Sequence, residues 1–143
     1  MAKVIPGYKL IGQGYNVVPV AKRTATAKNV TAPKGVIALL AEPQRLKDTI
    51  IITPGGTTTF LAPLLYRDIG GIITFAGAPE SHLGIVGRNF RVPIVMTIKL
   101  EEGDSIPDGT NLLMDCSEGK IGYVYAKVAP HQPEKSKPGA ALE

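Results

Sequence analysis

The stretch from Gly70 to Met96 constrains the fold of this chain most, because it joins short segments of contrasting preference. An apolar run at 72–75 predicts a buried strand, and the Gly and Pro residues that follow it predict a loop. Apolar side chains then recur at helical spacing from Leu83 to Phe90, and a further strand is expected from Val92 to Ile98. We therefore expect a strand, a loop, a helix and a second strand, in that order.

The chain has two histidines, and one of them, His82, lies where this loop enters the expected helix. The first amides of a helix lack intrahelical partners and carry the positive end of the helix dipole, so this place favours an anion such as phosphate. The same field disfavours imidazolium and leaves a neutral ring nitrogen able to act as a nucleophile. Ser81 is interpreted either as the N-cap of the helix or as a group that orients the imidazole or binds phosphoryl oxygens.

Composition limits the classes of protein to which the chain can belong. Its 143 residues suit one domain, and its 16 Gly, 12 Pro and many short Val, Ile and Thr segments predict more strand than helix. The net charge of +4 forms no basic stripe with interleaved aromatics, so we expect no nucleic-acid partner. Because Cys116 is the single cysteine, neither a disulfide nor a cysteine-based metal site is expected within the chain.

The hydropathy pattern contains no run of about 18 apolar residues and no signal-peptide core. We therefore expect no membrane partner and a cytoplasmic location. The charged, Pro-containing end of the chain has no periodicity, so the expected domain spans residues 1–128 and a disordered tail spans 129–143. The second histidine, His131, falls in this tail.

The amino-terminal half predicts the following elements. Tyr8–Ala21 is expected to form two extended segments around a turn at Gly12–Gly14, in an edge position marked by Pro19. A surface loop is expected over Lys22–Pro33, and a buried strand over Gly35–Ala41. A helical turn at Pro43–Leu46 would lead to a strand at Thr49–Thr53.

The remaining pattern predicts parallel pairing followed by a hairpin. Thr57 or Thr58 is expected to cap a helix that ends near Asp68, which makes 50–75 a strand, helix, strand unit with parallel strands. His82 then lies beyond the carboxyl ends of parallel strands, where open α/β sheets carry their sites. The segments Thr110–Asp115 and Ile121–Lys127 are expected to pair antiparallel.

Several motifs of this chain occur together in a known family. They are Gly77-Ala78, Ser81-His82, Ile85-Val86, Arg88 and Pro93, with Asp48–Thr53 and Thr57–Leu65 upstream and Glu102–Asp104, Pro107–Thr110, Met114-Asp115 and Glu118–Gly122 downstream. Together they resemble the phosphohistidine, or mobile, domain of the phosphoenolpyruvate-utilising enzymes, a group that includes pyruvate phosphate dikinase and phosphoenolpyruvate synthase. The resemblance covers roughly Lys34 to Tyr125.

This resemblance implies a fold and a set of site residues. The implied fold is an α/β, swivelling β/β/α domain with a mixed, largely parallel sheet, flanking helices and a C-terminal β-hairpin. The implied catalytic residues are His82, which would be phosphorylated transiently, and Ser81. The implied cofactor-binding residues are Gly77, Ala78 and Thr57. No metal ligands are expected in the chain.

The resemblance also implies partners. No cofactor would be bound by this chain; Mg²⁺ and ATP or phosphoenolpyruvate would be bound by partner subunits of the nucleotide-grasp and phosphoenolpyruvate-binding kinds. The expected activity is that of a phosphotransferase component that is inactive without those partners. The phosphoryl donor, the final acceptor and the oligomeric state remain open.

Glu80 departs from the family, which usually has Thr at this position, and Leu83 replaces a small residue. A phosphoryl group about 6 Å from the Glu80 carboxylate would feel a repulsion of roughly 1 to 2 kcal/mol. This substitution either tunes phosphohistidine toward easier transfer or marks a domain that is no longer phosphorylated. The alternative function is therefore a non-catalytic interaction or regulatory module that retains the swivelling fold.

Overall fold

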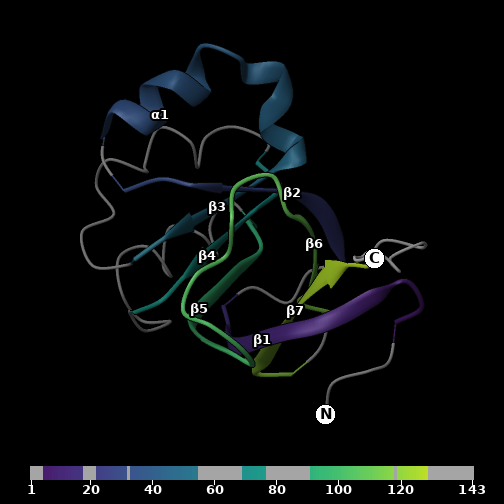
Figure 1. Cartoon of the computed structure of the whole chain (residues 1–143). Helices are drawn as coiled ribbons and strands as arrows, with labels where there is room; N and C mark the ends of the chain where they lie inside the picture. The colour runs from purple at the N-terminus through teal and green to yellow at the C-terminus, as the bar shows by residue number, and fades with distance from the viewer. Residues whose placement is uncertain are drawn as a thin grey trace, which may run out of the picture.

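Seven strands close into a barrel with two short helical elements on its outside (Figure 1). The computed structural model describes residues 5–17, 22–31, 33–54, 69–76, 91–117 and 119–128. The elements are β1 (Tyr8–Asn16), β2 (Arg23–Asn29), α1 (Pro33–Leu40), the 3-10 helix η1 (Pro43–Asp48), β3 (Thr49–Thr53), β4 (Gly71–Thr74), β5 (Ile94–Leu100), β6 (Asn111–Asp115) and β7 (Ile121–Lys127). The strand order around the barrel is β1-β5-β4-β3-β2-β6-β7.

The expected α/β fold class with a largely parallel sheet is wrong. Parallel pairing is confined to β2 with β3, β3 with β4 and β4 with β5. The other four pairings, which involve β1 and β6, are antiparallel, and they close the sheet into a barrel. In the part of the chain that the structure describes, helix is confined to α1 and η1, so the protein is mainly β. The antiparallel hairpin of β6 and β7 is confirmed.

Two apolar cores form because the central strands are buried on both faces. Ile51 on β3 packs with Val36 of α1 and Leu46 of η1, so this cluster lies between the barrel and the helices. Ile50 on the same strand packs with Leu112 of β6, so that cluster fills the barrel interior. Strands covered on both faces are continuously apolar rather than alternating, as the TIIIT sequence of β3 is.

Two predictions for the amino-terminal region are wrong. Tyr8–Asn16 is a single strand without a turn at Gly12–Gly14. It pairs with β5 on one side and β7 on the other, so it is not an edge strand. Those glycines permit close packing: a Cβ atom on Gly14 would lie 2.5 Å from the Met96 carbonyl oxygen. The expected loop at Lys22–Pro33 contains β2, whose small inward side chains, such as Ala27, obscured the strand pattern.

The expected strand at Gly35–Ala41 is also wrong, because this run lies largely in α1. Pro33 begins the helix, where its missing N–H costs no hydrogen bond. Val36 is 3% exposed and Ile37 is 68% exposed, so only one side of the helix is buried. A short apolar run does not distinguish a buried strand from a buried helix by periodicity alone.

The predictions around the central strands are confirmed. Pro43 begins η1, β3 spans the expected Thr49–Thr53, and β3, β4 and β5 are parallel neighbours. The expected helices after Thr57 and His82 lie outside the described residues. Residues 129–143, the expected tail, also lie outside them, and the proposed domain boundary stays a prediction.

Candidate functional site

All five site residues expected from the sequence lie outside the described residues: Thr57, Gly77, Ala78, Ser81 and His82. The structure does describe the points on the barrel where the segments that carry them begin and end. Residues 55–68 connect β3 to β4, and residues 77–90 connect β4 to β5.

The two segments begin next to each other at the carboxyl ends of β3 and β4. Thr53 and Thr74, the last residues of these strands, are partners in the parallel register and are 3% and 0% exposed. The Phe75 amide donates to the Thr53 carbonyl oxygen at 3.2 Å, which extends the pairing beyond the last residue of β4. The chain therefore leaves toward Thr57 and toward His82 from the same end of the barrel, at the carboxyl ends of neighbouring parallel strands.

The buried hydroxyl of Thr74 makes two hydrogen bonds at this end of the barrel. It donates to the Ala76 carbonyl oxygen at 2.8 Å and accepts from the Thr97 amide at 3.3 Å. Ala76 is the last described residue before the segment that carries His82. One side chain thus holds the exit from β4 and also ties it to β5.

Thr97 lies in a bulge of β5 and has an unusual backbone conformation. Its φ is 54°, and the register of β5 against β1 shifts between Met96 and Lys99. Only Arg91 shares a positive φ with Thr97 among the non-glycine residues that the structure describes. For a β-branched residue this conformation costs about 1 to 3 kcal/mol and persists only where the surrounding structure imposes it.

The segment that carries His82 is also fixed where it returns to the sheet. Val92 is 4% exposed and belongs to the apolar cluster between the barrel and the helices. The Pro93 carbonyl oxygen accepts the Ile72 amide at 2.9 Å. Both ends of residues 77–90 are therefore attached to β4, one through the Thr74 hydroxyl and the other through Ile72. A rigid frame of this kind suits a site that must be held in a defined geometry.

Thr74 and Thr97 were not among the residues expected from the sequence to serve the site. A usable signal was a polar residue, Thr74, within the apolar run at 72–75 and three residues before the Gly and Pro loop. A buried hydroxyl must have hydrogen-bond partners, so a threonine at that point predicts a bond to nearby backbone. Nothing in the sequence indicates that one of its partners is the amide of Thr97.

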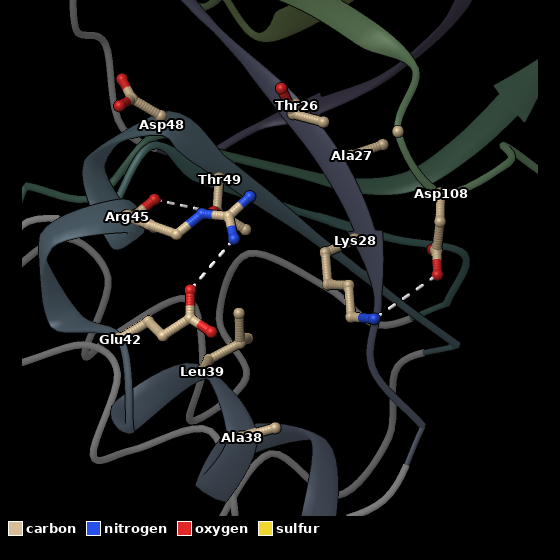
Figure 2. Close-up of a pocket in the computed structure, with 11 residues that line it drawn as sticks. Thr26, Ala27, Lys28, Ala38, Leu39, Glu42, Arg45, Asp48, Thr49 and Asp108 are labelled. Atoms are coloured by element: carbon tan, nitrogen blue, oxygen red, sulfur yellow. Dashed lines mark hydrogen bonds and ion pairs between the residues drawn. The ribbon is translucent and has the colours of Figure 1, made fainter.

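A separate groove of about 510 Å³ runs along the outer face of β2 (Figure 2). It is lined by Thr26, Ala27, Lys28, Ala38, Leu39, Glu42, Arg45, Asp48, Thr49, Asp108 and Gly109. Figure 2 shows the two basic side chains turned toward acidic neighbours: Arg45 Nη1 lies 3.0 Å from Glu42 Oε1, and Lys28 Nζ lies 3.6 Å from Asp108 Oδ2. No residue at the carboxyl ends of β3 or β4 is among those that line it.

Asp108 is the most strongly hydrogen-bonded acid of this groove. Its Oδ1 accepts the backbone amide and the side-chain amide of Asn29, both at 2.7 Å. These bonds lower the pKa of Asp108, the backbone amide most, and Lys28 adds a smaller effect. The Asp108 carboxylate therefore holds Asn29, the last residue of β2, in place. Because Lys28 and Arg45 are both paired with acids of the groove, these charges indicate a structural role.

The single cysteine, Cys116, packs in the barrel interior as part of its apolar core. Cys116 is fully buried in the barrel core, and this burial raises the pKa of its thiol to about 12, so it stays protonated at neutral pH. Within the described ranges, no three His, Cys, Asp or Glu side chains lie close enough together to hold a metal ion. No helix in the same part of the chain has both the length and the apolarity to cross a membrane.

The described geometry is that of a small β-barrel domain that presents two segments from adjacent ends of parallel strands. Comparison with known families assigns it more closely: residues 46–119, slightly more than half of the 143, match the PEP-utilising enzyme, mobile domain. The chain belongs to this family, as the motifs around His82 indicated. The matched region includes all five of the site residues expected from the sequence.

Two similar proteins are both phosphoenolpyruvate synthases. The one from Escherichia coli is 27% identical over 127 residues, which cover 88% of this chain and 15% of that protein. The one from Helicobacter pylori is 34% identical over 69 residues, which cover 48% of this chain and 8% of that protein. The chain thus spans less than a sixth of the length of each relative.

Proposed function

We propose that this protein is a phosphoryl carrier in which His82 is phosphorylated at one active site and delivers the group at another. The observation that carries the proposal is the match to the PEP-utilising mobile domain over residues that include Ser81 and His82. The tied ends of the 77–90 segment support it, because they fix where that segment leaves and rejoins the barrel. Gly77, Ala78 and Thr57 are proposed to contact the phosphoryl group.

The chemistry is a displacement at phosphorus. A neutral imidazole nitrogen of His82 forms an N–P bond while the P–O bond to the donor breaks, and the donor oxygen leaves with the electron pair. The donor is phosphoenolpyruvate or ATP bound with Mg²⁺ on partner subunits or domains of the nucleotide-grasp and phosphoenolpyruvate-binding kinds. Positive groups at those sites stabilise the transferring charge, so this chain alone should turn over nothing.

A phosphorylation assay with matched histidine variants tests the proposal. The protein is incubated with a phosphoenolpyruvate synthase fragment that lacks its own mobile domain, together with phosphoenolpyruvate or ATP that carries labelled phosphate. We expect an acid-labile, base-stable phosphoprotein, lost in His82→Ala and retained in the control His131→Ala. Label that persists in His82→Ala, or wild-type protein that takes up none from either donor, would overturn the carrier function.

The second candidate function, an interaction or regulatory module without phosphorylation, is favoured by Glu80 and Leu83, which stand where the family usually has Thr and a small residue. Glu80→Thr separates the two hypotheses. In a carrier, this change removes a repulsion of roughly 1 to 2 kcal/mol and raises the phosphohistidine equilibrium by up to about tenfold. In a module that has lost the reaction, neither the wild-type protein nor Glu80→Thr accepts label.

A further inference from the structure

We propose that Thr74 is a positioning residue for the transfer at His82, because its hydroxyl fixes the direction in which the chain leaves β4. This inference rests on the carrier function proposed above. It assigns no chemical step to Thr74, which would act through the backbone of Ala76 and Thr97.

The first argument is that the hydroxyl of Thr74 both donates and accepts a hydrogen bond. A hydroxyl group donates one hydrogen bond, and Thr74 spends it on the Ala76 carbonyl oxygen at 2.8 Å. The Thr74 hydroxyl oxygen also accepts the Thr97 amide at 3.3 Å. Thr74 is 0% exposed, so water does not reach its hydroxyl, although Ala76 itself is exposed. The two bonds therefore hold a single arrangement of the chain at this point.

The second argument is where the ladder of backbone hydrogen bonds stops. The Phe75 amide still bonds to the Thr53 carbonyl oxygen, at 3.2 Å. One residue further on, the Ala76 carbonyl oxygen is held by the Thr74 side chain. Beyond the last backbone hydrogen bond of the sheet, the Thr74 hydroxyl holds the chain at Ala76, directly before the segment that carries His82.

The third argument is the bulge that brings the Thr97 amide to this hydroxyl. Residues Thr97 and Ile98 together face Gly14, and the φ of Thr97 is 54°. A G1-type bulge has a left-handed residue at this position, usually Gly, and here it is β-branched. Strain of this sort concentrates at functional sites and needs surrounding structure to hold it. Thr74 supplies part of that structure.

The consequence is a geometric one. In a group transfer, a displacement of the nucleophile by about 1 Å can reduce the rate about 100-fold. Loss of the Thr74 hydroxyl frees the Ala76 carbonyl and lets the chain leave β4 in several directions. We expect the rate at which His82 is phosphorylated to fall, while the barrel stays folded.

Three variants test this inference with the assay described above. Thr74→Val keeps the shape and removes the hydroxyl, and it should slow phosphorylation of His82 by at least about tenfold. Thr74→Ser restores the hydroxyl and should stay within about threefold of wild type. Thr49→Val is the matched control: Thr49 is 8% exposed and donates to the Arg45 carbonyl oxygen, also at 2.8 Å, at the opposite end of the parallel strands. It should leave the rate unchanged.

Each assay is run well below the thermal midpoint of the variant, and the exchange rate of the Thr97 amide reports the lost hydrogen bond directly. It should rise in Thr74→Val and recover in Thr74→Ser. If Thr74→Val does not fold, Thr74→Ala replaces it, since alanine removes the hydroxyl and puts no methyl group in its place.

The failure of this inference can be told apart from the failure of the carrier function. Wild-type protein that takes up no label overturns the carrier function, and the role of Thr74 falls with it. Wild-type labelling with an equally fast Thr74→Val overturns the role of Thr74 alone. The same holds if Thr74→Ser is as slow as Thr74→Val, or if Thr49→Val is slowed as much.

Discussion

Thr49 and Thr74 place the same chemical group at opposite ends of the parallel strands, with different consequences. Each is buried, and each donates its hydroxyl to a backbone carbonyl oxygen at 2.8 Å. Thr49 bonds to Arg45, four residues earlier in the chain, and so closes the junction between η1 and β3. Thr74 bonds forward to Ala76 and also receives the amide of Thr97 from another strand.

Under the carrier function proposed above, this difference separates a bond that stabilises the fold from a bond that positions the segment with His82. At the amino ends of the strands the threonine bond is local, joins two residues whose φ is not positive, and fixes the entry into β3. At the carboxyl ends it joins two strands and helps hold Thr97 at a φ of 54°. Strain is tolerated at the end from which the segment with His82 leaves the sheet, which is where a defined geometry would be used.

The largest effects should come from filling the glycine contacts at the two ends. A Cβ on Gly14, beneath the bulge, would lie 2.5 Å from the Met96 carbonyl oxygen, and one on Gly70 would lie 2.7 Å from the Thr49 carbonyl oxygen. Backbone atoms cannot rotate away, so Gly14→Ala and Gly70→Ala should each lower the free energy of unfolding by about 2 to 3 kcal/mol. Thermal unfolding measures this directly.

Gly35→Ala is the matched control for those two variants. Gly35 lies in α1, and its added Cβ would meet a Val30 methyl group at 3.1 Å, which a small side-chain shift relieves. Alanine favours helix over glycine by about 1 kcal/mol, so this variant should be neutral or slightly more stable. An unchanged midpoint in Gly14→Ala would contradict the close packing of β1 on the bulge.

The next largest effect should distinguish the two threonines by stability. Thr49→Val leaves the Arg45 carbonyl without this bond, whereas Thr74→Val leaves both the Ala76 carbonyl and the Thr97 amide without it. At about 1 kcal/mol for each lost hydrogen bond, Thr49→Val should cost about 1 kcal/mol and Thr74→Val about 2. Urea unfolding of both variants checks this, and equal losses would mean that the Thr97 bond contributes nothing.

The parallel centre of this fold could be predicted from sequence, because its strands are short, continuously apolar runs followed by Gly and Pro. The TIIIT run of β3 was expected in place, and β4 and the hairpin of β6 and β7 were expected to within one residue. The fold class could not be predicted, because closure depends on β1 and β2. The glycines of β1 and the alanines of β2 carry little strand signal, and the β1 glycines pack by close approach to the backbone of β5.

The candidate site divides in the same way. The family of the chain follows from the residues around His82, since Ser-His motifs and their loops are local in sequence. The support from Thr74 and Thr97 could not be predicted, because it joins positions 23 residues apart through a bulge. The bulge itself depends on the register of β5 against β1, which no local pattern encodes.

A smaller effect is expected from relieving the strain at Thr97. Thr97→Gly removes the cost of a β-branched residue at positive φ and adds the greater chain entropy of glycine when unfolded. The first effect exceeds the second, so the variant should gain about 0.5 kcal/mol of stability. The control is Thr24→Gly at an exposed position of β2, where φ is not positive and only the entropic loss remains. A less stable Thr97→Gly would show that its side chain is needed more than its strain costs.

The smallest effect concerns a third carboxyl end, that of β2, which is held by a charged and exposed group. Asp108 accepts both amides of Asn29, and these bonds lower the pKa of its carboxyl. Because the folded-state pKa lies below the unfolded value of about 3.9, the stabilisation is fully present above that pH. It is lost as the pH falls through the lowered folded-state pKa.

Asp108→Asn should therefore be slightly less stable than wild type at neutral pH, by less than about 1 kcal/mol because the site is exposed to solvent. The amide oxygen of the new side chain still accepts a hydrogen bond but carries no charge, so the deficit should vanish in acid. Urea unfolding from about pH 7 down to about pH 2 measures both the deficit at neutral pH and its loss in acid. The deficit of Thr74→Val should not change with pH over that range, because a hydroxyl does not titrate there. A deficit in Asp108→Asn that is the same at both ends of the range would mean that the charge of Asp108 adds nothing to its hold on Asn29.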